Sequence, residues 1–146
     1  MKKSIHKVII ASIFLLVVSP LIADTVIESP DKRINLHLTD KEKTEFLSEM
    51  RQMLASIQGV ISGIAEEDIN KIIKSARYSG NRMARATPSS IKAKTPLQFK
   101  EIGGPTHMMF EEMVIRAETD DMQSLTELTA QIMQQCLACH AIFKAN

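Results

Sequence analysis

The chain has few cysteines and few aromatic residues, and no part of it alternates in the manner of a β-strand. Of its 146 residues only two are cysteines, none is tryptophan and 4% are aromatic. A single pair of cysteines excludes a disulfide-rich scaffold. Because no segment alternates apolar and polar residues over the length of a strand, a fold built on a β-sheet is not expected either.

The sequence also lacks an apolar run long enough to span a bilayer, which takes about 20 apolar residues. Its longest run, Val8 to Val18, follows three lysines and precedes the small residue Ala23. A basic start, a short apolar centre and a small residue near the end are typical of a secretory signal peptide. We therefore predict that residues 1–23 are a signal peptide, that the mature protein is periplasmic in a Gram-negative-type cell, and that no membrane attachment remains after cleavage. A retained N-terminal anchor is the alternative.

No large excess of one charge remains once this leader is removed. The leader contains three of the 18 basic residues and none of the 17 acidic ones, so the rest has a net charge of about −2. Nucleic acid is therefore not an expected partner. The charges are nevertheless uneven, because residues 69–100 contain eight basic residues and no acidic one. Such a segment favours an acidic partner.

Four amphipathic helices are expected after a flexible segment that covers residues 24–38. Thr39 and Glu42 have the spacing of a capping box, and apolar residues then recur every three or four positions up to Ile64. The same spacing predicts three further helices, which cover residues 67–86, 95–117 and 121–144.

The third of these helices has prolines at its start and in its middle. Thr95 is the predicted N-cap and Pro96 the first helical residue, whereas Gly103-Gly104-Pro105 predicts a kink. The connections are mostly short, and the longest joins the second and third helices. The sequence thus predicts one all-α domain over residues 39–146, folded as an antiparallel four-helix bundle.

Both cysteines lie in one short motif, Cys136-Leu-Ala-Cys139-His140. Two thiols three residues apart lie on the same side of a helix. There they can form thioethers with the two vinyl groups of one haem, while the adjacent histidine reaches the iron. CxxCH is an attachment signature of haem c. The sequence therefore predicts one covalently bound haem c, with Cys136 and Cys139 as anchors and His140 as the proximal iron ligand.

Three other interpretations of the motif are weaker. A disulfide between Cys136 and Cys139 would close a small loop in mid-helix and add little stability. A thioredoxin-like redox pair is expected at a helix N-terminus after a strand, whereas this pair is near a helix C-terminus. A zinc site requires a fourth ligand and a second pair, and neither is evident in the sequence.

Attachment of haem near the end of the last helix of a four-helix bundle resembles the class II c-type cytochromes, that is, the cytochrome c-prime family and its methionine-ligated low-spin branch. The resemblance covers about residues 39–144, and it is specific only at the CxxCH motif. It implies a periplasmic haem protein whose iron is either six-coordinate, with a methionine from the first helix, or five-coordinate, with a buried open face. In the methionine-ligated branch a basic residue follows the distal methionine, and Met50-Arg51 resembles that pair.

Helix geometry gives an independent reason to choose Met50. If antiparallel helices over about 40–65 and 121–144 are aligned, Met50 is level with position 135, and Met53 lies roughly 4–5 Å further along at 1.5 Å per residue. Met50 is therefore the predicted distal iron ligand and Met53 the second choice. The competing interpretation is that methionine on an apolar helix face is usually plain core.

The remaining histidines are not expected to bind iron. His107 falls some 12 Å from His140 along the helix axis by the same geometry, and we expect it to be half-exposed or hydrogen-bonded. His37 precedes the helices and is expected in solvent.

Five residues are predicted to line the haem: Phe46, Gly80, Met83, Phe99 and Phe143. Gly80 is included because its missing side chain leaves room for a flat ring.

These expectations describe an electron carrier rather than an enzyme, namely a periplasmic monohaem c-type cytochrome that transfers one electron at a time. The alternative is a five-coordinate cytochrome c-prime that binds nitric oxide or carbon monoxide. An acidic redox protein is the expected partner, because four basic residues are predicted around the haem edge: Arg82, Arg85, Lys92 and Lys94. Whether two copies pair into a homodimer stays open.

Overall fold

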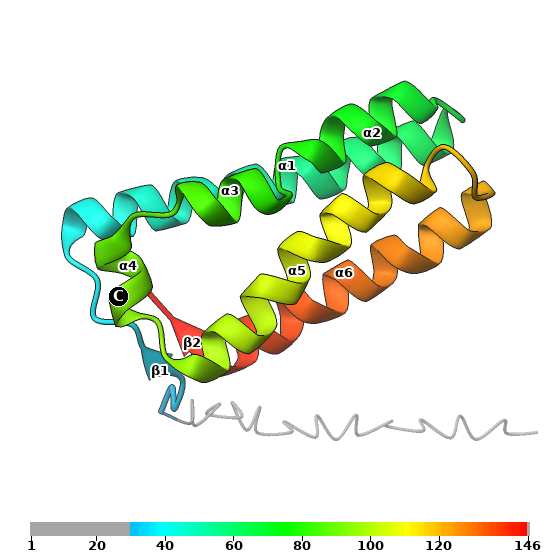
Figure 1. The fold of residues 1–146 in the computed structure, drawn as a ribbon. Helices are drawn as coiled ribbons and strands as arrows, with labels where there is room; N and C mark the ends of the chain where they lie inside the picture. The colour runs from blue at the N-terminus through cyan, green and yellow to red at the C-terminus, as the bar shows by residue number, and fades with distance from the viewer. Residues whose placement is uncertain (1–29, 146) are drawn as a thin grey trace, which may run out of the picture. The chain divides into compact units, whose positions relative to one another are not determined.

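A computed structural model describes residues 30–145, and this part of the chain is all-α apart from one short pair of strands (Figure 1). The predicted fold class is confirmed at this level. The predicted signal peptide, residues 1–23, lies outside the described residues. No helix within residues 30–145 is both long enough and apolar enough to cross a bilayer. The helices are α1 (Asp40–Ala65), α2 (Ile69–Arg77), α3 (Asn81–Ala86), α4 (Ser89–Lys94), α5 (Leu97–Arg116) and α6 (Met122–Ile142).

The starts of α1 and α6 follow the capping signals in the sequence. The Thr39 hydroxyl accepts a hydrogen bond from the Glu42 N–H, and the Glu42 carboxylate accepts one from the Thr39 N–H at 2.8 Å, which completes the predicted capping box. At α6 the Asp121 carboxylate accepts from the Ser124 N–H at 2.7 Å. Both helices therefore begin where local side chains satisfy otherwise unpaired N–H groups.

The helix predicted over residues 67–86 is two helices in the structure. α2 ends at Arg77, and α3 begins after Gly80, whose backbone is extended and which supplies no capping side chain. The cap comes instead from α5, because the Glu111 carboxylate accepts a hydrogen bond from the Asn81 N–H at 2.7 Å. A Cβ built on Gly80 would clash with the Glu111 carboxylate, so the absence of a side chain permits this approach. The single predicted helix was therefore wrong at residues 78–80.

The start of α5 also differs from the prediction. Pro96, rather than Thr95, is the N-cap, and the Thr95 hydroxyl donates backward to the Lys92 carbonyl at 3.0 Å. Thr95 is instead the C-cap of α4, a helix that the sequence pattern did not indicate. Pro105 does not interrupt the helix, which continues from Leu97 to Arg116.

Four longer helices form the body of the described structure. α1 packs against α2 and α6, and α5 packs against α2 and α6. The colours in Figure 1 show that α1 and α5 run in one direction along the body, and that α2 and α6 run in the other. The short helix α3 follows α2 and packs against α5, and α4 lies at the end where α6 terminates (Figure 1).

The segment before α1 is part of this domain. β1 (Ile34–Asn35) pairs in parallel with β2 (Phe143–Lys144), and the Leu36 N–H donates to the Lys144 carbonyl at 3.0 Å. Leu36 and Leu38 are buried, with exposed fractions of 3% and 8%. The compact unit begins at Asp31. The predicted boundary at residue 39 was thus too late, because Leu36 and Leu38 bury their side chains next to the end of α6.

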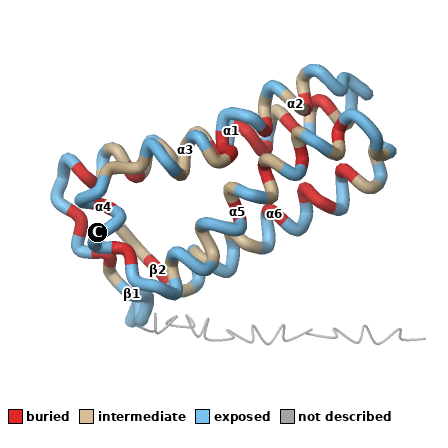
Figure 2. Tube along the Cα trace, in the orientation of Figure 1, coloured by how far each residue is buried: buried red, intermediate tan, exposed pale blue. Residues whose placement is uncertain are grey.

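The buried side chains fall into two clusters, which Figure 2 shows as separate groups of buried segments. The main cluster joins α1, α2, α5 and α6, and includes Ile72, Phe110 and Leu125, each 0% exposed. The second cluster lies around the strand pair and α4. Its buried members are Leu36, Leu38, Phe46, Ile91 and Phe143.

Candidate functional site

The CxxCH motif occupies the last two turns of α6. Cys136 and Cys139 are half-buried with free thiols, and His140 is exposed in the final helical turn. The helix ends at once after the motif, because Phe143 adopts an extended conformation and enters β2. The motif therefore lies in a regular helix, and the residues that follow the helix are held by pairing between β2 and β1.

The two thiols lie against different parts of the core. Cys136 packs on the main cluster, whereas Cys139 packs on the second cluster. Burial raises the pKa of both thiols, and the nearby Cys136 adds to the increase at Cys139. A raised pKa disfavours the thiolate, which is the form that attacks disulfides or binds zinc. The surroundings thus suit neutral, structurally held thiols better than a redox or zinc pair.

Met50 is a half-buried side chain of α1 that packs against both clusters, and no other half-buried hydrophobic residue within residues 30–145 does so. It therefore lies at the junction of the clusters on which the two cysteines pack. Met53, the second choice from the sequence, is 8% exposed and belongs to the main cluster itself. The structure thus separates the two methionines, with Met50 packed against both clusters and Met53 inside the main one.

Three of the predicted haem-lining residues meet in the second cluster. The ring centres of Phe46 and Phe99 are 5.8 Å apart, and those of Phe99 and Phe143 are 5.4 Å apart. Phe46 and Phe143 are buried, and Phe99 packs beside them together with Cys139. Ile91 completes this apolar wall at 0% exposure, although it lies in a segment that the sequence analysis took for a connection. It is the only large aliphatic residue in that segment, which is the signal that could have identified it.

The other two predicted haem-lining residues are not in this group. Gly80 is at the junction of α2 and α3, where its missing side chain makes room for the carboxylate of Glu111 rather than for a ring. Met83 packs on the main cluster.

The remaining histidines are placed as the sequence suggested. His107 is half-buried, and its Nδ1 lies 2.7 Å from the Ser79 carbonyl oxygen, which requires the proton to be on Nδ1. His37 is exposed. The Nδ1 atom of His107 is therefore already used in a contact with the backbone.

Two charged residues next to the predicted site residues could not be identified from the sequence pattern. Burial raises the pKa of the Glu49 carboxyl, which precedes Met50, and a hydrogen bond from the Thr87 hydroxyl opposes that shift. Arg33 contacts the motif itself, because its Nη1 donates a hydrogen bond to the His140 carbonyl at 3.3 Å. Both depend on contacts between residues more than 35 positions apart, so local spacing could not indicate them.

Two of the four basic residues expected around the site already form polar contacts within the protein. Lys94 forms an ion pair with Glu42 at 2.6 Å, and the Lys92 ammonium donates to the Arg85 carbonyl at 3.0 Å. The guanidinium groups of Arg82 and Arg85 have no carboxylate within 4.0 Å among the described residues. The free positive charge therefore lies on α3 more than on α4.

Within residues 30–145, no three or more His, Cys, Asp or Glu side chains converge in a way that could hold a metal ion directly. The motif supplies one exposed imidazole and two half-buried thiols on the same helix, and the Met50 thioether packs from α1 on the same two clusters as the thiols. Comparison with protein-family models, with curated proteins and with solved structures found no match to the chain.

Proposed function

We propose that this chain is a periplasmic monohaem c-type cytochrome of the class II type, an electron carrier without catalytic activity of its own. In this proposal α1, α2, α5 and α6 are the antiparallel four-helix bundle, and a single haem c is attached near the end of α6. The observation that carries it is the position of the CxxCH motif, whose thiols pack on the two core clusters that Met50 joins from α1.

Each residue of the site has a distinct role in the proposal. Cys136 and Cys139 anchor the group covalently, and their raised pKa values disfavour the thiolate form that a zinc ligand or a redox thiol would use. His140 supplies the proximal imidazole, and Met50 supplies a thioether from the opposite helix. The bound haem would supply an iron that changes oxidation state by one electron, and ligation by the His140 imidazole and the Met50 thioether would raise its potential. Phe46, Phe99 and Phe143 would exclude water from one side, because their rings already pack together.

The proposed partner is a redox protein with an acidic surface. The support is electrostatic, since residues 69–100 contain eight basic residues and no acidic one. Complementary charge mainly accelerates association and makes it sensitive to salt. An electron-transfer rate that falls with increasing ionic strength is the expected result, and a rate that is indifferent to salt would remove this support.

The decisive experiment is a visible spectrum of the chain matured in a periplasm that attaches haem c, with and without carbon monoxide. We expect covalent haem on a denaturing gel, a low-spin spectrum and a far-red methionine-to-iron band in the oxidised protein. Cys136→Ser together with Cys139→Ser should abolish covalent attachment. A wild-type chain without covalent haem would overturn the proposal.

The distal ligand is tested by a matched pair of variants, Met50→Leu and Met53→Leu. Leucine nearly conserves the volume of methionine, so packing is kept while the thioether is removed. We expect the far-red band to be lost in Met50→Leu and kept in Met53→Leu. Loss in Met53→Leu alone would assign the ligand to Met53. A high-spin wild type that binds carbon monoxide readily, and that neither variant alters, would instead establish the five-coordinate gas-binding alternative.

A further inference from the structure

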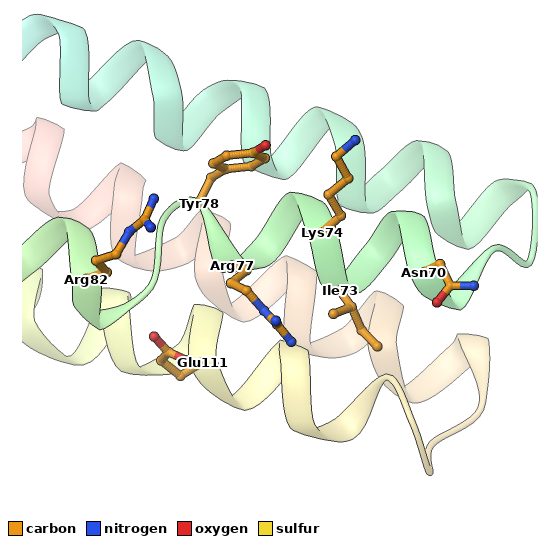
Figure 3. A pocket seen from close by; sticks show the side chains of 7 residues that line it. All are labelled: Asn70, Ile73, Lys74, Arg77, Tyr78, Arg82 and Glu111. Atoms are coloured by element: carbon orange, nitrogen blue, oxygen red, sulfur yellow. The ribbon is translucent and has the colours of Figure 1, made fainter.

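A hollow on the surface formed by α2, α3 and α5 lies apart from the CxxCH motif. It has a volume of about 510 Å³ and is lined by Asn70, Ile73, Lys74, Arg77, Tyr78, Arg82 and Glu111. Figure 3 shows Ile73 and Arg77 extending from α2 toward α5, and Glu111 extending back toward the α2–α3 junction. α2 packs against α1 and α5, whereas the motif is on α6. The hollow is within the 300–1,000 Å³ range common for small-molecule sites.

The charges in this hollow are not balanced. Lys74, Arg77 and Arg82 are exposed, and no carboxylate among the described residues lies within 4.0 Å of their charged nitrogens. Glu111 is the one acid in the lining, and its Oε1 is committed to the Asn81 N–H at 2.7 Å. Three positive charges and one negative charge leave a net charge of +2, which a single dianion would neutralise.

The hollow also has features that a bare cluster of lysines and arginines would lack. Two of its cations are arginines, whose planar guanidinium groups bind phosphate or carboxylate oxygens in pairs. Ile73 and Tyr78 add apolar surface beside them, and the Asn70 amide adds a neutral hydrogen-bonding group. The volume exceeds what an inorganic anion needs, so the chemistry fits an anion that carries an organic body.

We propose that this hollow binds a small organic dianion, of the phosphate monoester or dicarboxylate class. Arg77 and Arg82 bind its charged oxygens from α2 and α3, Lys74 adds the third positive charge, and Ile73 and Tyr78 contact its organic part. Glu111 caps the first turn of α3, the helix that carries Arg82. The proposal does not depend on haem attachment, because α2, α3 and α5 line the hollow and the motif is on α6.

The test is isothermal titration of the full chain, as purified, with phenyl phosphate, phthalate and inorganic phosphate at 0.15 M sodium chloride. We expect saturable binding of phenyl phosphate or phthalate with a Kd of about 1 mM or tighter, and at least roughly tenfold weaker binding of inorganic phosphate, which cannot use the apolar surface. Stronger binding of phenyl phosphate identifies the phosphate monoester class, and stronger binding of phthalate identifies the dicarboxylate class.

Three variants, each of which removes one positive charge, distinguish specific binding in the hollow from nonspecific electrostatic attraction to the basic surface. Arg77→Ala and Arg82→Ala should each weaken binding roughly tenfold, as expected for the loss of a hydrogen bond to a charged group. Lys71→Ala is the matched control, because Lys71 is on α2 but pairs with Glu66 at 2.7 Å and does not line the hollow. It should change Kd less than twofold. Equal weakening in all three variants, no saturable binding, or inorganic phosphate binding as tightly as the two organic anions would each overturn the proposal.

Discussion

The segment before α1 is predicted to contribute to global stability, which a flexible linker would not do. The test is Leu36→Ala. The Leu36 side chain is 3% exposed and packs in the cluster that contains Phe143 and Phe46. Truncating a buried leucine to alanine costs about 2–5 kcal/mol, since transfer free energy is lost and a cavity remains. Domains of this size are stable by only about 5–15 kcal/mol, so the loss should be plain in equilibrium unfolding.

The assay is urea unfolding followed by circular dichroism, with wild type and variant carrying the same haem content. With a loss of about 3 kcal/mol and a slope of about 1.5 kcal/mol per molar urea, the midpoint should decrease by about 2 M. Ile34→Ala is the matched control, because Ile34 is in the same segment but is 45% exposed. It should cost about 1 kcal/mol or less.

The same variant tests whether the segment steadies the motif. The Arg33 side chain donates to the His140 carbonyl, and the Leu36 N–H donates to the Lys144 carbonyl. Both hydrogen bonds therefore join this segment to the C-terminal end of α6 and the strand that follows it. Amide hydrogen exchange in residues 139–142 should be faster in Leu36→Ala than in Ile34→Ala. If the two variants unfold at the same urea concentration and exchange alike, then residues 31–38 do not belong to the cooperative unit, and the reasoning fails.

Two further predictions concern polar contacts. A hydrogen-bonded ion pair with Lys94 lowers the pKa of Glu42 to about 2, from an ordinary value of 4.5. Its contribution is therefore complete above pH 4.5 and is lost as the pH falls toward 2. Glu42→Gln should be less stable than wild type at pH 7, with the difference in urea midpoint shrinking over that window; a constant difference would contradict it. The Ser79 and Ser56 hydroxyls are buried and 2.8 Å apart. Ser79→Ala should cost about 1–3 kcal/mol by leaving Ser56 unpaired, whereas the double alanine variant should cost less than the sum of the two single ones, and strict additivity would contradict the pairing.

The positions of the site residues could be anticipated only in part. Cys136, Cys139 and His140 were singled out by their spacing alone, which matches an attachment signature of haem c, and their role in binding haem stays a prediction. Met50 was preferred over Met53 by a simple alignment of antiparallel helices, and the structure agrees in placing Met50 at the junction of the two clusters. Its role as an iron ligand stays a prediction. Gly80 was interpreted wrongly, since nothing in its local sequence indicates that Glu111 approaches it from another helix.

The sequence by itself determined the helical class, the starts of α1 and α6, and the motif. Each of these depends on residues within a few positions of one another, as when Thr39 pairs with Glu42. Tertiary structure decided what depends on distant residues. The break before α3 relies on Glu111, the strand pair joins Ile34 to Phe143, and the hollow needs α2, α3 and α5 together. These features could not be predicted from local spacing, because packing between distant segments decides which side chains meet.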